Sequence, residues 1–194
     1  MNAKDEFINK FNPELSEDER KKLPKITRGT DTDEEKVFMT IPYIMEGKVM
    51  SIYKIHQPKE VKERFKNYKD CRHITKTKYL WHGSKTENWL SIIADGLKMS
   101  YAADGKHGKG LYFGLAPNKS MGYVTRVDNK DTDTVFIGLF KTAYGNPCFN
   151  PVKDEIDKDV YDCAHEKGDD KTTEIVFYDD DAVILEYVVE FEPL

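Results

Sequence analysis

The sequence predicts an α+β fold with a mainly antiparallel split β-sheet core and short flanking helices. Two strand-like segments, 174–178 and 183–191, follow one another directly near the end of the chain, with only the acidic turn 179–181 between them. Earlier strand-like segments are separated by short helical segments. Parallel βαβ units would instead require strands that alternate with long helices. The chain has 194 residues, which suffices for one domain with its own core.

Local patterns predict the individual elements in chain order. Residues 1–33 are polar and predict a loosely attached N-terminal extension, so the folded domain is expected at 34–194. Apolar segments at 37–45 and 49–55, joined by Glu46-Gly47, predict a hairpin. The other expected elements are helices at 58–70, 85–97 and 117–124, and strands at 78–81, 111–113 and 135–140.

Composition and missing motifs exclude several classes of function. The three cysteines, Cys71, Cys148 and Cys163, have no C-x-x-C spacing, so free thiols are expected, without a disulfide framework or metal site. There is no apolar run of 18 residues and no secretory signal, which predicts an intracellular protein that does not span a membrane. A Rossmann glycine fingerprint, a P-loop and a G-x-S-x-G elbow are also absent.

Charge is distributed unevenly along a chain whose net charge is −5. Residues 54–78 carry nine Lys and Arg against three acidic residues, whereas residues 153–194 carry four Lys against fifteen acidic residues. The basic segment could contact nucleic acid. The alternative is a solvated helix face, which the negative net charge and the absence of interleaved aromatic residues favour.

The segment Trp81-His82-Gly83-Ser84 is the first candidate for a binding site. Glycine permits the close approach of a ligand to the backbone, and a histidine at the end of a strand can hydrogen-bond a ribose hydroxyl. Taken alone, the segment is more typical of a turn histidine with satisfied hydrogen bonds.

A second candidate extends from Gly108 to Tyr123. A strand-to-helix turn between Tyr112 and Tyr123 would bring both rings onto one flat substrate. Ser120 precedes Tyr123 by one helical turn, so its hydroxyl would reach the same pocket. Taken alone, these residues are also consistent with two core tyrosines and a surface serine.

Together these segments resemble the catalytic domain of the poly(ADP-ribose) polymerases, the diphtheria-toxin-like ADP-ribosyltransferases with a His-Tyr-Glu signature. The resemblance covers roughly residues 36–194 and implies the ADP-ribosyltransferase fold for the domain. The matching segments are Leu80-Trp81-His82-Gly83-Ser84, Ile92-Ile93-Ala94-Asp95-Gly96-Leu97, Gly108-Lys109-Gly110-Leu111-Tyr112-Phe113, Lys119-Ser120-Met121-Gly122-Tyr123 and Thr173-Glu174-Ile175-Val176-Phe177-Tyr178-Asp179.

The resemblance implies a catalytic set of Glu174, His82 and Tyr112. Glu174 would bind the 2′-hydroxyl of the nicotinamide ribose and stabilise the positive charge that develops as the glycosidic bond breaks. The resemblance also implies that His82 and Ser84 bind the adenosine ribose. The full set implied to bind NAD is His82, Gly83, Ser84, Tyr112, Ser120 and Tyr123.

The remaining roles in this set concern the nicotinamide. The backbone of Gly83 and the hydroxyl of Ser120 would hold its carboxamide. Tyr123 would stack on one face of the ring, and Tyr112 would pack on the other.

The implied activity is NAD-dependent transfer of ADP-ribose to protein acceptors, including the protein itself, as single units or as polymer. NAD is then a consumed substrate, and no metal is implied. The acceptor-side loop is expected at roughly 142–172. Two alternatives stay open: transfer to nucleic acid ends, which the basic segment motivates, and a non-catalytic module that binds NAD or ADP-ribose.

Overall fold

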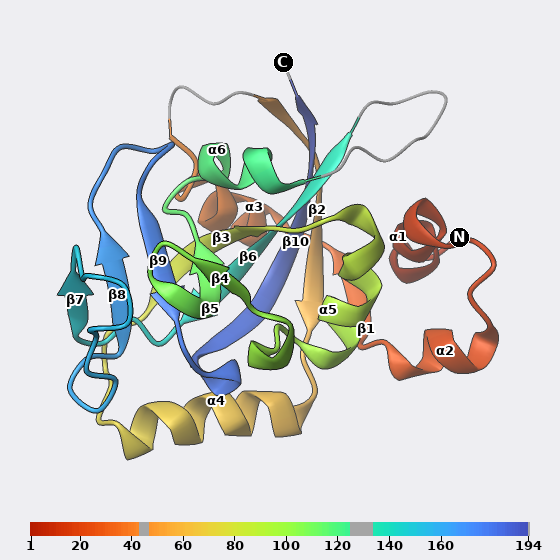
Figure 1. The fold of residues 1–194 in the computed structure, drawn as a ribbon. Coiled ribbons are helices and arrows are strands. Elements are labelled where there is room, and N and C mark those ends of the chain that lie inside the picture. The colour runs from red at the N-terminus through yellow and green to blue at the C-terminus, as the bar shows by residue number, and fades with distance from the viewer. Residues whose placement is uncertain (43–46, 125–133, 194) are drawn as a thin grey trace.

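The computed structural model describes residues 1–42, 47–124 and 134–193. Its strands form two five-stranded sheets, with the orders β1-β2-β10-β6-β3 and β4-β5-β9-β8-β7 (Figure 1). The strands are β1 Lys25–Arg28, β2 Gly47–His56, β3 Lys78–Gly83, β4 Ala103–Gly105, β5 Gly108–Phe113, β6 Val135–Thr142, β7 Pro147–Phe149, β8 Cys163–Glu166, β9 Glu174–Phe177 and β10 Val183–Pro193.

Neighbouring strands run antiparallel everywhere in these sheets except between β7 and β8. The two sheets meet where β3 passes the end of β5, because Trp81 and Gly114 exchange backbone hydrogen bonds of 2.9 and 2.8 Å. The architecture therefore confirms the α+β prediction with its split, mainly antiparallel core.

Short helices flank both sheets (Figure 1). The α-helices are α1 Ala3–Phe11, α2 Glu17–Lys22, α3 Asp31–Phe38, α4 Lys59–Cys71, α5 Trp89–Asp95 and α6 Pro117–Ser120, and the 3₁₀ turns are η1 Thr86–Asn88, η2 Met99–Tyr101, η3 Met121–Tyr123 and η4 Asp180–Ala182. Gly96 ends α5 with a φ of 78°, a left-handed conformation that favours glycine. None of the described helices is long and apolar enough to cross a membrane.

The main core lies between the two sheets and holds the site in place. Phe113 and Phe177 from the second sheet pack edge to face, with their ring centroids 5.6 Å apart. Phe140 from the first sheet contacts Phe113 at 5.3 Å. A second cluster, which includes Val37, Trp81 and other fully buried residues, also packs against the first sheet. The site strands β3, β5 and β9 are thereby fixed by aromatic packing.

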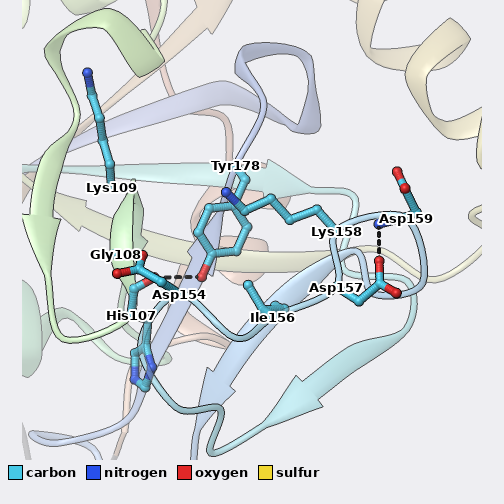
Figure 2. Close-up of a pocket in the computed structure, with 9 residues that line it drawn as sticks. All are labelled: His107, Gly108, Lys109, Asp154, Ile156, Asp157, Lys158, Asp159 and Tyr178. Carbon is cyan, nitrogen blue, oxygen red and sulfur yellow. Dashed lines mark hydrogen bonds between the residues drawn. The ribbon is translucent and has the colours of Figure 1, made fainter.

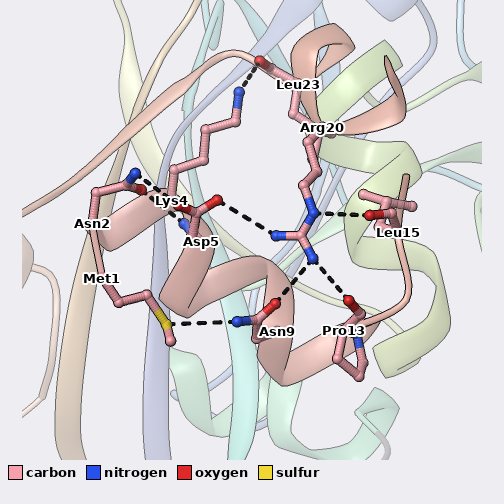
Figure 3. Close-up of polar contacts among 9 residues, drawn as sticks. All are labelled: Met1, Asn2, Lys4, Asp5, Asn9, Pro13, Leu15, Arg20 and Leu23. Atoms are coloured by element: carbon pink, nitrogen blue, oxygen red, sulfur yellow. Dashed lines mark hydrogen bonds and ion pairs between the residues drawn. The ribbon is translucent and has the colours of Figure 1, made fainter. Parts of the chain in front are cut away.

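The prediction that residues 1–33 are loosely attached is wrong. Phe7 and Ile8 of α1 have no exposed surface and belong to the main core, and β1 pairs with β2 along its whole length. The partly buried guanidinium of Arg20 fastens α2 to α1, because it donates to Asn9 Oδ1 at 3.0 Å and to the carbonyls of Leu15 and Pro13 at 2.8 and 2.9 Å (Figure 3). The segment is polar in composition, but a few apolar side chains anchor it.

We expect Phe7→Ala to lower the free energy of unfolding by about 3–5 kcal/mol, since it removes a fully buried ring. The ring contacts Tyr53 at 4.8 Å and Phe136 at 5.9 Å between centroids. Urea denaturation measures the change. The matched control Phe38→Ala removes a half-exposed ring and is expected to cost less than about 1 kcal/mol. Equal effects of the two substitutions would show that α1 is not part of the cooperative unit.

The predicted hairpin at 37–55 is half wrong. Its second strand forms as β2, but Val37 and Phe38 lie in helix α3. A capping box starts that helix: the Asp33 backbone N–H donates to Thr30 Oγ1, and Asp33 Oδ2 accepts from the Thr30 backbone N–H. Residues 43–46, where the predicted first strand and turn meet, lie outside the described residues.

The expected acceptor-side loop at 142–172 contains regular secondary structure. It contains β7 and β8, which extend the second sheet beyond β9. At one side of the molecule this pair lies opposite α1 and α2 (Figure 1). The strands have only three and four residues, too few for a pattern in the sequence to reveal them.

Candidate functional site

A cavity of about 800 Å³ opens between β3, α5, β5 and α6. All seven residues predicted for the site line it: His82, Gly83, Ser84, Tyr112, Ser120, Tyr123 and Glu174. These residues come from three segments that are distant in the sequence. A volume of this size accommodates a ligand of dinucleotide dimensions.

His82 lies near the end of β3, and its Nδ1 is 2.8 Å from the carbonyl oxygen of Tyr112. A carbonyl can only accept, so Nδ1 carries the proton and Nε2 is left as an acceptor. Burial lowers the pKa of His82 below its usual value, and the hydrogen bond to Tyr112 offsets this only in part. The imidazole is therefore neutral at pH 7 and can accept a hydrogen bond from a hydroxyl.

Gly83 and Ser120 form the tightest backbone approach in the cavity wall. A Cβ at Gly83 would lie 2.3 Å from the Ser120 carbonyl oxygen. This distance is too short for two non-bonded atoms, so no side chain fits at position 83. Ser120 itself is buried at the end of α6, a helix that begins at Pro117 as expected. The absence of a side chain at Gly83 thus lets α6 lie directly against β3.

Tyr112 is locked in place by the segment that precedes it. Its hydroxyl donates to the Gly108 carbonyl at 2.6 Å and accepts from the His107 backbone N–H at 3.0 Å. Its ring covers Gly105, where a Cβ would come within 2.6 Å of it. Tyr123, by contrast, has 58% of its surface exposed and can adjust to a ligand.

Glu174 begins β9 and forms an ion pair with Lys119 of α6, with 2.9 Å between Oε1 and Nζ. Only 13% of the Glu174 side chain and 20% of the Lys119 side chain are exposed. This pairing neutralises a carboxylate that would otherwise be unpaired in a largely buried position. The sequence contains Lys119 within a matched motif, but no pattern in it indicates the contact with Glu174.

We expect Lys119→Met to lower both stability and turnover. The unfolding free energy should fall by about 1–3 kcal/mol, because Glu174 loses its charged partner. If Glu174 has the role that the resemblance implies, turnover of NAD should also fall on the order of 10- to 100-fold, because the carboxylate is no longer held in one orientation. Thermal unfolding and labelled-NAD turnover measure the two effects, with Lys62→Met on the exposed face of α4 as the control. Wild-type turnover in Lys119→Met would contradict the positioning role.

A second, smaller cavity of about 310 Å³ lies beside the start of β5 (Figure 2). Its walls come from the 107–109 segment, from Tyr178 and from residues 154–159 of the acceptor-side loop. Lys158 lies over the Tyr178 ring at 4.5 Å from the centroid. The loop is therefore packed against the same segment that holds Tyr112.

The basic segment 54–78 does not contribute to the main cavity. None of its residues lines that cavity, and helix α4 runs along a separate edge of the molecule (Figure 1). At least five of its basic side chains form ion pairs, for example Arg64 with Asp181 and Arg72 with Asp162. The arrangement fits a solvated helix face better than a nucleic-acid surface.

Among residues 1–42, 47–124 and 134–193 there is no group of three His, Cys, Asp or Glu side chains that could hold a metal ion. Cys71, Cys148 and Cys163 are all free thiols.

Comparisons with known proteins point to one family. A family model for the poly(ADP-ribose) polymerase catalytic domain matches residues 39–184, well over half of the chain. The chain is 28% identical over 102 residues to poly [ADP-ribose] polymerase 1 of Xenopus laevis. The aligned region covers 50% of this chain and 10% of that protein.

Two mammalian proteins show similar likeness. The protein mono-ADP-ribosyltransferase PARP3 of Homo sapiens is 34% identical over 73 residues, 38% of this chain and 13% of that protein. The Mus musculus protein of the same name is 33% identical over 66 residues, 34% of this chain and 12% of that protein. The aligned parts thus span roughly a tenth of the length of these curated relatives.

Proposed function

The chain belongs to the poly(ADP-ribose) polymerase catalytic domain family, and from that premise we propose that it cleaves the nicotinamide–ribose bond of NAD and transfers the ADP-ribose to protein acceptors. Residues 34–194 would form the catalytic domain, with residues 1–33 packed onto it. NAD is the consumed substrate.

One observation carries this proposal: a single cavity is lined by all seven residues that the motifs identify. His82 and Glu174 come from different sheets and are 92 positions apart in the sequence, yet both line it. A histidine, two serines, two tyrosines and a carboxylate can together hydrogen-bond ribose hydroxyls, stack on an aromatic ring and stabilise positive charge on a sugar.

The binding roles follow from the contacts of each residue. Neutral His82 offers Nε2 to a hydroxyl of the adenosine ribose, and Ser84 lies beside it. Gly83 lies against the backbone of Ser120, and both residues line the cavity, so the Gly83 backbone and the Ser120 hydroxyl would bind one carboxamide. Tyr112 and Tyr123 enclose the nicotinamide ring, the former rigid and the latter adjustable.

Glu174 performs the chemical role. As the C–N bond breaks, its electron pair leaves with nicotinamide, and the ribose acquires positive charge. A fixed carboxylate beside that ribose stabilises the charge without reorganising. Lys119 contacts Oε1 of Glu174, and the second carboxylate oxygen remains able to accept a hydrogen bond from the ribose hydroxyl.

The acceptors are proteins, this protein among them, and we propose that the reaction takes place inside the cell, where NAD is available. The names of the relatives include both a polymerase and mono-transferases. A gel of the self-modified protein distinguishes the two: a discrete band indicates single units, and a smear indicates polymer.

The test uses NAD that carries a label on its adenylate phosphate. Incubation with the protein, with added protein and with nucleic acid should transfer label to protein, together with release of nicotinamide. Label on DNA or RNA ends would favour the nucleic-acid alternative, and tight NAD binding without nicotinamide release would favour a non-catalytic module. Absence of both transfer and nicotinamide release overturns the proposal.

A further inference from the structure

A second carboxylate lies next to Glu174 on the neighbouring strand. In the antiparallel pair of β8 and β9, Glu166 is the direct partner of Glu174. Residues that face each other across such a pair have Cβ atoms about 4.5–5.5 Å apart and point to the same face of the sheet. The two side chains therefore leave the sheet on the same face, Glu174 into the cavity and Glu166 just outside the residues that line it.

Each of these carboxylates is paired with its own lysine. Glu174 is held by Lys119 at 2.9 Å, and Glu166 by Lys106 at 2.5 Å. Two like charges directly opposite each other on a sheet repel and destabilise the strand pair. The two lysines offset this repulsion, which would not arise if residue 166 were uncharged. The hydrogen bond from Lys106 lowers the pKa of Glu166, which keeps its carboxylate ionised at neutral pH.

The Lys106–Glu166 pair lies at the boundary between the NAD cavity and the acceptor-side loop. Lys106 lines the cavity, while Glu166 ends β8, the strand that this loop contributes to the sheet. The Lys106 side chain is 64% exposed and can turn toward solvent, whereas only 23% of Glu166 is exposed. An incoming acceptor that displaces Lys106 would meet the Glu166 carboxylate beside Glu174.

His107 lies beside Glu166, in a position fixed by its backbone. Its Nε2 lies 3.4 Å from Glu166 Oε2, and neither ring nitrogen has a hydrogen-bond partner among the described residues. The Tyr178 hydroxyl donates to the His107 carbonyl at 2.9 Å (Figure 2). The His107 backbone N–H donates to the Tyr112 hydroxyl at 3.0 Å.

On the basis of these contacts, and resting on the proposed transferase function, we propose that Glu166 accepts the proton of a hydroxyl acceptor, so that the site modifies serine-type side chains in preference to carboxylates. The hydroxyl oxygen forms the new bond to the ribose carbon, nicotinamide leaves with the electron pair of the broken C–N bond, and the hydroxyl proton passes to Glu166 and then to water.

The preference follows from the difference between the two nucleophiles. A hydroxyl must lose a proton as it attacks, so it gains from a nearby base. A carboxylate acceptor is already ionised, needs no base and is repelled by Glu166 and Glu174. Glu174 is occupied by the ribose hydroxyl, which leaves Glu166 as the available proton acceptor.

The experiment compares two synthetic peptides that differ only in a single acceptor residue, serine or glutamate, with labelled NAD as donor. The wild-type protein should modify the serine peptide faster. In Glu166→Gln the ratio of serine to glutamate modification should fall at least about tenfold, within the range that general bases contribute. Glu166→Asp, which keeps the carboxylate on a shorter chain, should restore part of the ratio. The control Glu155→Gln removes an exposed carboxylate of the same loop and should keep the wild-type ratio.

The outcomes separate this proposal from the proposed function. A wild-type protein that modifies only the glutamate peptide, or a ratio in Glu166→Gln within twofold of wild type, overturns the role of Glu166 while transferase activity stands. Absence of nicotinamide release with every acceptor overturns the transferase function itself. Thermal unfolding of each variant verifies that it is folded.

Discussion

Glu174→Gln should abolish most of the transfer of ADP-ribose while leaving NAD binding largely intact. The amide has the shape of the carboxylate but lacks its charge, so it cannot stabilise the positive charge on the ribose as the glycosidic bond breaks. We expect turnover to fall on the order of 10²-fold or more, which corresponds to about 2.7 kcal/mol or more of activation free energy. The loss should appear in kcat, because the remaining cavity residues still bind the dinucleotide.

Two measurements on the same preparation test this expectation. Labelled NAD reports turnover, and calorimetric titration with NAD reports binding. Glu87→Gln, which changes an exposed carboxylate on η1 outside the cavity lining, is the matched control. Turnover near the wild-type rate in Glu174→Gln would remove Glu174 from the mechanism, and loss of NAD binding would show that it mainly holds the substrate.

The residues that line the cavity could be singled out in the sequence because they lie in short motifs with constrained backbones. His82 comes at a strand end before a glycine, and Ser120 and Tyr123 follow a proline that begins a helix. Such local signals survive in the sequence. Their convergence on one cavity depends on the two sheets meeting at Trp81 and Gly114, and only the family resemblance indicated that meeting in advance.

Long-range side-chain pairs were not predictable. Lys119 meets Glu174 because α6 lies against β3 and faces the start of β9, a result of packing that no spacing encodes. The partnership of Glu166 with Glu174 depends on the register of two strands of four residues each. A shift of one residue in the pairing of β8 with β9 would turn one carboxylate to the opposite face of the sheet. Such a pair can therefore be identified only when the register is known.

The errors in the fold prediction have a common physical origin. The apolar residues around Val37 resembled a strand, yet the Thr30-x-x-Asp33 capping box upstream favours a helix and was the available signal. In the first 33 residues, average polarity concealed Phe7 and Ile8, which contribute to the core. Burial of a few side chains outweighs the composition of a segment, since each fully buried apolar side chain contributes about 1.5–3 kcal/mol.

Gly83→Ala should damage the site more than any other single methyl group added to its wall. The new Cβ would lie 2.3 Å from the Ser120 carbonyl oxygen, and that atom belongs to the backbone, so relief requires moving α6. Movement of α6 displaces Ser120 and also Lys119, the partner of Glu174. We expect a loss of about 1–3 kcal/mol in unfolding free energy. We also expect kcat/KM for NAD to fall on the order of 10²-fold, because a displacement near 1 Å is enough to misalign reacting groups.

The matched control for this substitution is Gly122→Ala in η3, where a Cβ would meet no heavy atom within 4 Å. It adds the same methyl group two residues after Ser120 and should change the unfolding free energy by no more than about 0.5 kcal/mol. Urea denaturation and NAD turnover on both variants separate a general effect of the added methyl from the specific collision. Near-wild-type kcat/KM in Gly83→Ala would mean that α6 can shift without disturbing the ligand, and the close approach of β3 and α6 would then be a packing feature alone. A selective loss in Gly83→Ala would instead link the glycine, the position of the Ser120 hydroxyl and the orientation of Glu174 in one rigid unit.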